Sequence, residues 1–474
     1  MTALGQASGL PTAVRRRPPP AVGVLAAAVL LTAGSYLGPA LLGDSAGPAA
    51  DAPRDILTIP GGAPAAGGTS TAEGRFPLPE RIAFWTTRVQ EQPSDFLSYI
   101  QLAVTWSEQG RLRVDLEAYA RADEAIERAL AIAPAYPPAF AVRASIRFAT
   151  HDFAGAEADA RTTLAAIPTD AAALAILGDA VLELGRLNEA AATYDRLAEV
   201  AGGPALDIRT ARLAYLGGDP AAALELARKA LIGASGGGPT GEETSDAVAL
   251  GFYHFALGEY ARLAGDADLA GAQFRAALEL RGDDLGALLG LARVAAFRGD
   301  LDGATAALER ATAIAPLPES EALLGDVLAA RGRPGDAAAS ADAYAVVRLT
   351  GTLSELAGSV YDRALITFES DHGGADAVLL ARAEAALATR ADAAGHDLVA
   401  WALHGLGREE AAWAASLEAR AGGIHDARIL FHAGAIAVAR GDAATGEALL
   451  RDALALGPAL DPLERAEALS LLGG

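Results

Sequence analysis

Histidines are the side chains of this chain best suited to acid–base or metal chemistry near neutral pH. The seven are His151, His254, His372, His396, His404, His425 and His432. The sequence has no His-Glu-x-x-His motif and no two histidines four residues apart, the spacing that turns two imidazoles toward one metal. His425 and His432 could share a helix face, but Asp426 beside His425 is a typical helix cap. We interpret the histidines as turn and packing residues and predict no metal site.

Other chemical signatures are weak. The chain contains no Cys, which excludes disulfides, thiolate metal ligands and a cysteine nucleophile. The glycines of 233–241 match a phosphate-binding loop only in composition, because no Lys follows them to reach a phosphate. The plentiful carboxylates are typical of solvated helix faces. We therefore predict no catalytic residues and no cofactor.

Composition indicates an all-α protein with an acidic surface. Hydrophobic residues make up 52% of the 474 residues and aromatic residues only 5%, so the apolar content is mostly Ala, Leu and Val. Ala and Leu favour helices, whereas strands favour β-branched and aromatic residues. The formal net charge is −22. An acidic surface repels nucleic acid, so we expect no nucleic-acid partner.

The N-terminal segment predicts a membrane anchor. Residues 21–42 carry no charge and would span about 33 Å as a helix, against roughly 30 Å for a bilayer core. Arg15, Arg16 and Arg17 precede them, which predicts a cytoplasmic tail at 1–20 and a body outside the cytoplasm of a bacterial cell. The alternative is a signal peptide cleaved near Ala33, which would leave a secreted or periplasmic body. The Gly-, Ala- and Pro-rich residues 43–80 predict a flexible linker.

A repeated spacing organises the rest of the chain. Gly178 is followed after seven residues by Gly185, after five more by Ala190 and after four more by Tyr194. A small residue lets two helices approach closely, a glycine turns the chain between them, and the large residue fills the space beside them. The small residue of the first helix recurs, mostly 33 or 34 residues apart, at Ala103, Ala144, Gly178, Ala211, Gly258, Ala292, Gly325, Ala400 and Gly434. The turn recurs at Gly110, Gly185, Gly218, Gly265, Gly299, Gly332, Gly407 and Gly441, and the small residue of the second helix at Ala122, Ala156, Ala190, Ala223, Ala270, Ala304, Ala337 and Ala412.

This grid resembles the tetratricopeptide repeat (TPR) family, whose unit is a helix–turn–helix of 34 residues. The resemblance covers residues 81–474 and implies a right-handed α-solenoid, an all-α fold, preceded by the single transmembrane helix. We expect an early second helix in the first repeat, an insertion at 232–246 and a degenerate repeat around 345–380. Residues 461–472 predict a capping helix with Asp461 as its cap. The arrangement is also similar to membrane-anchored bacterial TPR proteins of unassigned function.

In the TPR family the first helix of each repeat lines a concave groove that binds partners. Carried onto this chain, the groove positions of the middle repeats are Arg212, Tyr215, Phe255, Glu259, Arg262 and Arg293. Three arginines at matching places suggest an acidic or carboxylate-bearing ligand, provided that they are exposed and unpaired. The alternative is that each arginine pairs with an acid of a neighbouring repeat and is an ordinary surface residue.

Two functions remain open from the sequence. The first is a non-catalytic, membrane-tethered scaffold that binds an extracytoplasmic protein or peptide. The second is a permanent accessory subunit or regulator of an envelope enzyme or transporter, bound through the convex side. The sequence does not reveal which partner is bound or how many copies assemble.

Overall fold

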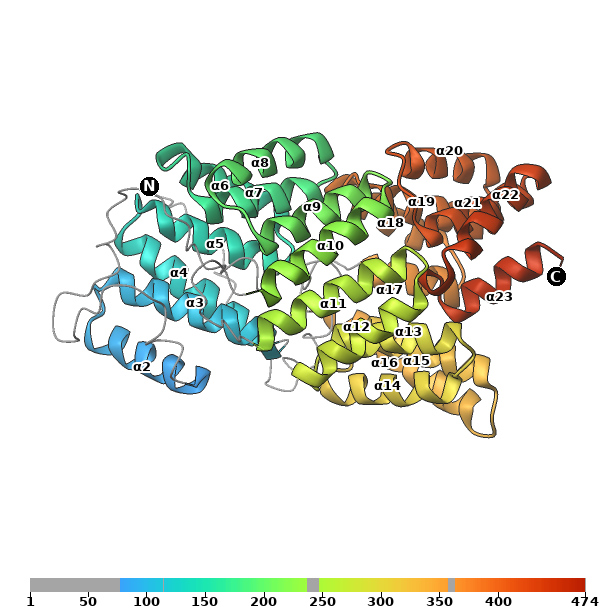
Figure 1. Ribbon diagram of the computed structural model, residues 1–474, viewed down its shortest axis with the longest axis horizontal. Coiled ribbons are helices and arrows are strands. Elements are labelled where there is room, and N and C mark those ends of the chain that lie inside the picture. The colour runs from blue at the N-terminus through green and yellow to red at the C-terminus, as the bar shows by residue number, and fades with distance from the viewer. Residues whose placement is uncertain (1–76, 114, 237–246, 357–362, 474) are drawn as a thin grey trace, which may run out of the picture.

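The computed structural model describes residues 77–113, 115–236, 247–356 and 363–473, and every regular element in these ranges is helical (Figure 1). The first elements are α2 (Leu78–Glu91), α3 (Phe96–Arg113), α4 (Leu116–Ile132), α5 (Pro137–Ala149), α6 (Phe153–Ala166), α7 (Ala171–Glu183), α8 (Leu187–Val200), α9 (Pro204–Leu216), α10 (Pro220–Ser235), α11 (Ala247–Leu263) and α12 (Ala267–Leu280). They are followed by α13 (Leu285–Phe297), α14 (Leu301–Ile314), α15 (Pro318–Arg331), α16 (Asp336–Leu356), α17 (Arg363–His372), α18 (Ala377–Thr389), α19 (Ala393–Gly405), α20 (Glu409–Arg420), α21 (Ala427–Ala439), α22 (Ala443–Ala455), the 3-10 turn η6 (Gly457–Ala459) and α23 (Pro462–Leu471). The all-α prediction is confirmed for the described residues.

Consecutive helices from α3 to α22 form pairs, and the predicted small residues lie where the two helices of a pair cross. Ala103, Ala144 and Ala292 have no exposed surface. At Gly178 an added side-chain carbon would lie 2.3 Å from the ring of Tyr194, which leaves no room for any other residue. The predicted pairing of a small residue with a large neighbour is therefore a steric requirement of the fold.

Two positions of the predicted grid are wrong. Gly110 lies inside α3, because that helix continues to Arg113, and its backbone does not turn. Ala337 is exposed at the start of α16, since the turn before that helix is longer than in the other repeats. Ser340, with 5% of its surface exposed, takes the buried place instead. The ring of Tyr344 then fills the space beside Gly325.

The predicted departures from the regular repeat are present. Helix α4 is longer than the other second helices near it and begins early, with its N-terminus capped by Asp115. The extra residues of 232–246 fall between α10 and α11, although 237–246 lie outside the described residues. The degenerate repeat consists of the short helix α17 and its partner α18.

The predicted N-terminal segments lie almost entirely outside the described residues. This applies to the tail at 1–20, the membrane segment at 21–42 and most of the linker at 43–80, whose last three residues already belong to α2. Within the described ranges, no helix combines the length and apolarity needed to cross a bilayer.

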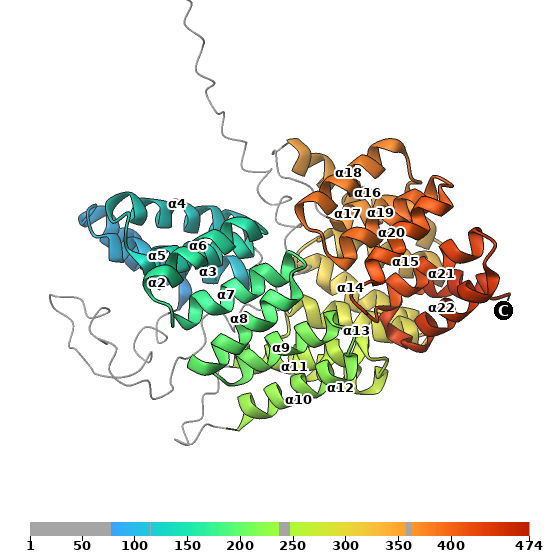
Figure 2. The same ribbon diagram turned by 90° about the horizontal axis from the view of Figure 1, so that it is seen from above.

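The repeats curl round until the end of the chain meets its middle. In Figure 2 the helices α2 to α6 project to one side, while the later repeats gather into a single body. An added side-chain carbon on Gly185 would lie 2.5 Å from the carbonyl oxygen of Ala391, and one on Gly218 would lie 2.0 Å from that of Gly423. Gly265, in the next turn, faces the carbonyl at the end of α22 at 3.3 Å. Three successive turns of the middle repeats thus contact three successive turns of the last repeats, and we call this line of contacts the seam.

The seam gives the first prediction. Gly218→Ala must fit a side chain against the backbone of Gly423 and also tolerate a φ of +86°. Gly441→Ala is the matched control, because Gly441 has the same φ of +86° and no atom within 4 Å of an added carbon. We expect both variants to lose about 1 kcal/mol or more from backbone strain, and Gly218→Ala to lose about 1–3 kcal/mol beyond that from overpacking. Urea denaturation followed by circular dichroism measures the difference, and equal losses would show that the seam does not hold the fold.

Candidate binding cavity

The concave side of the curled repeats encloses a half-open cavity of about 610 Å³. Its lining comes from the first helices of the repeats, α7, α9, α11, α13, α15, α17, α19 and α21, together with η6 and the turns of the seam. A volume of this size falls in the range of protein sites for small molecules or short peptide segments. We call it the central cavity.

The walls of the central cavity are highly charged, and acids outnumber bases. Six arginines line it, namely Arg212, Arg262, Arg293, Arg363, Arg390 and Arg428. Each of them contacts at least one carboxylate. The cavity is therefore a network of ion pairs, in which few charges depend on a ligand for a partner.

The sequence prediction of a row of exposed, unpaired cations is wrong. Arg212 pairs with Glu183 of the preceding repeat, and Arg262 pairs with Glu259 one turn away on its own helix. Arg293 contacts Glu319 of the next repeat at 3.0 Å. Only 21%, 8% and 15% of the three arginine side chains is exposed. The alternative interpretation, pairing with nearby acids, describes them correctly, although they line a cavity and are not ordinary surface residues.

The other predicted groove residues also have partners inside the protein. The hydroxyl of Tyr215 donates to Asp426 Oδ2 at 2.6 Å. Phe255 is 7% exposed and packs against the ring of Phe274. Burial works to raise the pKa of Glu259, but Arg262 beside it holds that pKa below its usual value. The structure brings Arg212, Tyr215, Glu259, Arg262 and Arg293 to the central cavity, whereas Phe255 does not line it.

Several of these contacts join residues far apart in the chain. Arg262 donates to the carbonyl oxygen of Pro458 at 3.1 Å, and Arg293 Nε donates to Asp461 Oδ1 at 2.9 Å. Arg390 contacts Glu183 at 2.8 Å across the seam. The residues predicted to bind a partner therefore hold the C-terminal segment of the same chain in place.

The C-terminal helix α23 has a second role for the same reason. Asp461 precedes the helix, as predicted, and its backbone N–H donates to Glu464 at 3.1 Å in a capping box. The helix packs on α21 and α22 of the last pair, and also on α13 and α15 from the middle of the chain. It thus covers the last repeat and closes one side of the central cavity.

One buried cluster at the cavity was not predicted from the sequence. His432 Nδ1 lies 2.9 Å from Asp397 Oδ2, and the imidazole stacks on Trp401 with ring centroids 4.0 Å apart. The indole N–H of Trp401 donates to Asp371 at 2.7 Å. Burial works to lower the pKa of His432, but Asp397 raises it above its usual value. A sequence signal was present, since Asp397 and Trp401 flank the small residue Ala400 on the groove face of their helix.

The cluster does not provide a metal site. Across the part of the chain that the structure describes, no group of three or more His, Cys, Asp or Glu side chains is placed to hold a metal ion. Several histidines have the packing or turn contacts that the sequence suggested. His151 adopts a φ of +63° in the turn between α5 and α6, and His372 bonds to Asp326 at 2.8 Å.

The long-range ion pair of Arg293 and Asp461 gives the second prediction. In a double-mutant cycle, Arg293→Met and Asp461→Asn should show a coupling energy of about 1–3 kcal/mol, because both side chains are at most 15% exposed. The control cycle uses Arg440→Met and Glu410→Gln, a pair whose acid is 83% exposed, and should give less than about 1 kcal/mol. Stabilities come from urea denaturation of the full chain. Equal coupling in the two cycles would mean that the closing contact adds nothing specific.

Comparison with known proteins finds likeness in structure only. No family model and no curated protein matches the sequence. Among solved structures, a tetratricopeptide repeat protein from Parabacteroides merdae is 14% identical, with a TM-score of 0.39 over 58% of this chain and 92% of that one. Human IFIT1, solved as a dimer with PPP-AAAA, is 16% identical, with a TM-score of 0.41 over 68% and 72%. YrrB, described as a TPR protein with an unusual peptide-binding site, is 16% identical, with a TM-score of 0.24 over 48% and 91%.

Identities below 25% and TM-scores below 0.5 carry no argument about function. The paired helices, the small residues at their crossings and the positive-φ glycines between them are properties of this chain itself. Taken together, they show that the chain has the all-helical repeat fold of the tetratricopeptide type.

Proposed function

We propose that this chain is a non-catalytic scaffold, tethered to a bacterial membrane through residues 21–42, that binds an extracytoplasmic protein or peptide. The central cavity is the observation that carries the proposal. It is half-open, it collects side chains from eight successive first helices, and it presents both charges beside apolar residues such as Leu323 and Ile429. Such a surface suits a short peptide segment, which offers charged, polar and apolar groups together.

The pairing of the arginines constrains the chemistry of the partner. A carboxylate of the partner would have to displace Glu183, Glu259 or Asp461 from an arginine that it already contacts. A partner that adds to the network without breaking it uses the remaining acids and the apolar walls. We therefore no longer favour a purely acidic ligand, and we propose a peptide with basic and apolar residues.

The membrane tether rests on the sequence. The uncharged run of 22 residues and the arginines before it favour an anchor whose body lies outside the cytoplasm. A body connected through the Gly- and Pro-rich linker could then reach partners near the membrane surface. The second function suggested by the sequence, a permanent accessory subunit, gains no specific support from the central cavity.

The third prediction concerns topology. Protease added to intact spheroplasts should digest the body, because the Arg15–Arg17 cluster retains the N-terminal tail on the cytoplasmic side. Immunoblotting with an antibody against the body measures the loss. Digestion that requires permeabilised cells would place the body in the cytoplasm, while recovery of the body in the soluble fraction would indicate signal cleavage.

The fourth prediction concerns the cavity. A photo-crosslinking amino acid at Ala394, an exposed residue of the cavity lining, should capture a discrete partner in living cells. The control places the same amino acid at Ala381, an exposed residue of α18 outside the lining. We expect a cross-linked species at Ala394 at least about tenfold above that at Ala381, a preference equivalent to about 1.4 kcal/mol. Equal yields at both positions, or none at Ala394, would contradict binding in the central cavity.

A further inference from the structure

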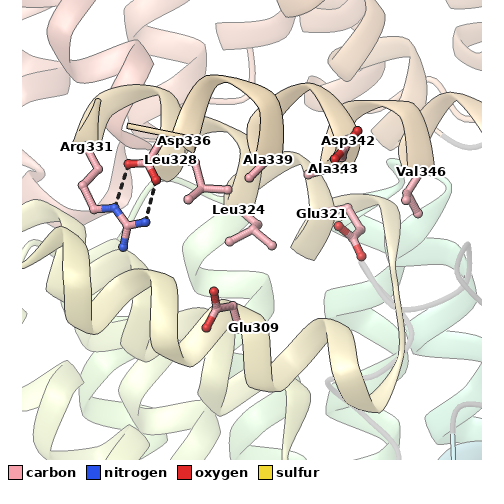
Figure 3. A pocket seen from close by; sticks show the side chains of 11 residues that line it. Glu309, Glu321, Leu324, Leu328, Arg331, Asp336, Ala339, Asp342, Ala343 and Val346 are labelled. Atoms are coloured by element: carbon pink, nitrogen blue, oxygen red, sulfur yellow. Dashed lines mark hydrogen bonds and ion pairs between the residues drawn. The ribbon is translucent and has the colours of Figure 1, made fainter. Parts of the chain in front are cut away.

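A second pocket, of about 390 Å³, lies on the other side of α15 from the central cavity (Figure 3). Its walls come from α14, α15 and α16. We call it the outer acidic pocket and define it by the carboxylates of Glu309, Glu321 and Asp342 and the apolar side chains of Leu324, Leu328 and Val346.

Helix α15 separates the two sites by its periodicity. Glu319, Ala322 and Asp326 line the central cavity and recur at steps of three and four residues, which keeps them on one helix face. Glu321, Leu324 and Leu328 recur at the same steps but are offset by two residues, which turns them to the opposite face. A partner could therefore occupy the outer acidic pocket independently of anything bound in the central cavity.

Glu321 is the unusual residue of this pocket. It is only 7% exposed, yet its carboxylate has no hydrogen bond or ion pair with any described residue. Glu309 and Asp342 are exposed at the rim, and neither carboxylate has an ionic partner among the described residues. The basic residue of the lining, Arg331, is already bound by Asp336 at 2.8 Å and by Asp302 at 3.2 Å.

An unpaired, buried carboxylate costs stability. Removing it from water is unfavourable unless hydrogen bonds or an opposite charge replace the water, and here burial raises the pKa of Glu321. A hydrophobic residue or Gln of similar volume would avoid that cost. The cost would be offset by a cation that enters the pocket from outside the chain.

The apolar wall indicates which cation fits. The described carboxylates are not gathered closely enough to hold a metal ion. Leu324 and Val346 present apolar surface beside the acids, which suits the methylene stem of a long side chain whose charged end reaches Glu321 (Figure 3).

We propose that the outer acidic pocket binds a Lys or Arg side chain of a partner protein, with the stem on Leu324, Leu328 and Val346 and the charged end on Glu321. Glu309 and Asp342 at the rim attract the cation before it enters, and the negative charge of the whole chain adds to the attraction. The pocket is a second binding surface, distinct from the central cavity.

A tethered cation tests the pocket without a known partner. The chain has no Cys, so Ala339→Cys, at an exposed position of the lining, provides a unique attachment point. The full chain is labelled there with aminoethyl methanethiosulfonate, which adds an ammonium group, or with propyl methanethiosulfonate, which adds a neutral chain of similar length. We expect the aminoethyl adduct to melt about 2–4 °C higher, because it supplies the missing charge at high effective concentration.

Two substitutions make the result specific. In Glu321→Gln the difference between the adducts should disappear, while the unlabelled variant should melt at or above the temperature of the parent chain, because a buried charge has been removed. Glu279→Gln is the control, since it removes an equally negative but exposed residue on α12 and should leave the difference intact. Equal melting temperatures of the two adducts, or a difference that persists in Glu321→Gln, would overturn the proposal.

The partner is tested in cells. A photo-crosslinking amino acid at Ala338, exposed next to the pocket, should capture a protein in the parent chain and in Glu279→Gln. In Glu321→Gln the yield should fall at least about tenfold, the loss expected when one charged contact of about 1.4 kcal/mol is removed. An unchanged yield in Glu321→Gln, or no captured protein in the parent chain, would show that no basic partner uses this pocket.

Discussion

The fold depends on the close approach of the two helices in each repeat. Gly178, Gly258 and Gly325 face the rings of Tyr194, Phe274 and Tyr344, and in each case an added side-chain carbon would lie less than 3 Å from the ring. Such contacts fix the angle and depth of every helix pair, because neither partner can move without leaving a void or a clash. A single pair cannot bury both of its faces, so the pairs must stack on one another.

Stacking with a small rotation at each step produces the curvature, and the curvature produces the central cavity. Because the chain is long enough to curl back on itself, the turns of α7, α9 and α11 meet the turns near the C-terminus. The seam is made by backbone atoms and tolerates only glycine at Gly185 and Gly218, where φ is also positive. Glycines that the sequence explains as ordinary turn residues are thus also contact residues between distant repeats.

The charged lining of the central cavity has a structural role as well as a possible binding role. Burying an ion pair costs much of what the pairing returns, so these pairs contribute more to the choice of one arrangement than to overall stability. Arg293 contacts Glu319 and Asp461, and Arg390 contacts Glu183 and Asp392, so each arginine joins two different segments. In contrast, Glu321 on the outer face has no such partner, which is why that site points outward to another protein.

The sequence by itself determined the helix pairs, because their signals are local. The small residue, the turn glycine and the capping Asp act within one repeat, and most of them lie where the spacing predicts. Even within a repeat, the longer turn before α16 moved the buried position from Ala337 to Ser340, since three added residues shift every later contact. Only the tertiary structure decided the site. Arg262 and Arg293 were correctly placed on the inner face, but their partners include Pro458 and Asp461, more than 160 positions away in the chain. No local pattern encodes that contact, because it results from the small rotations of all the repeats in between.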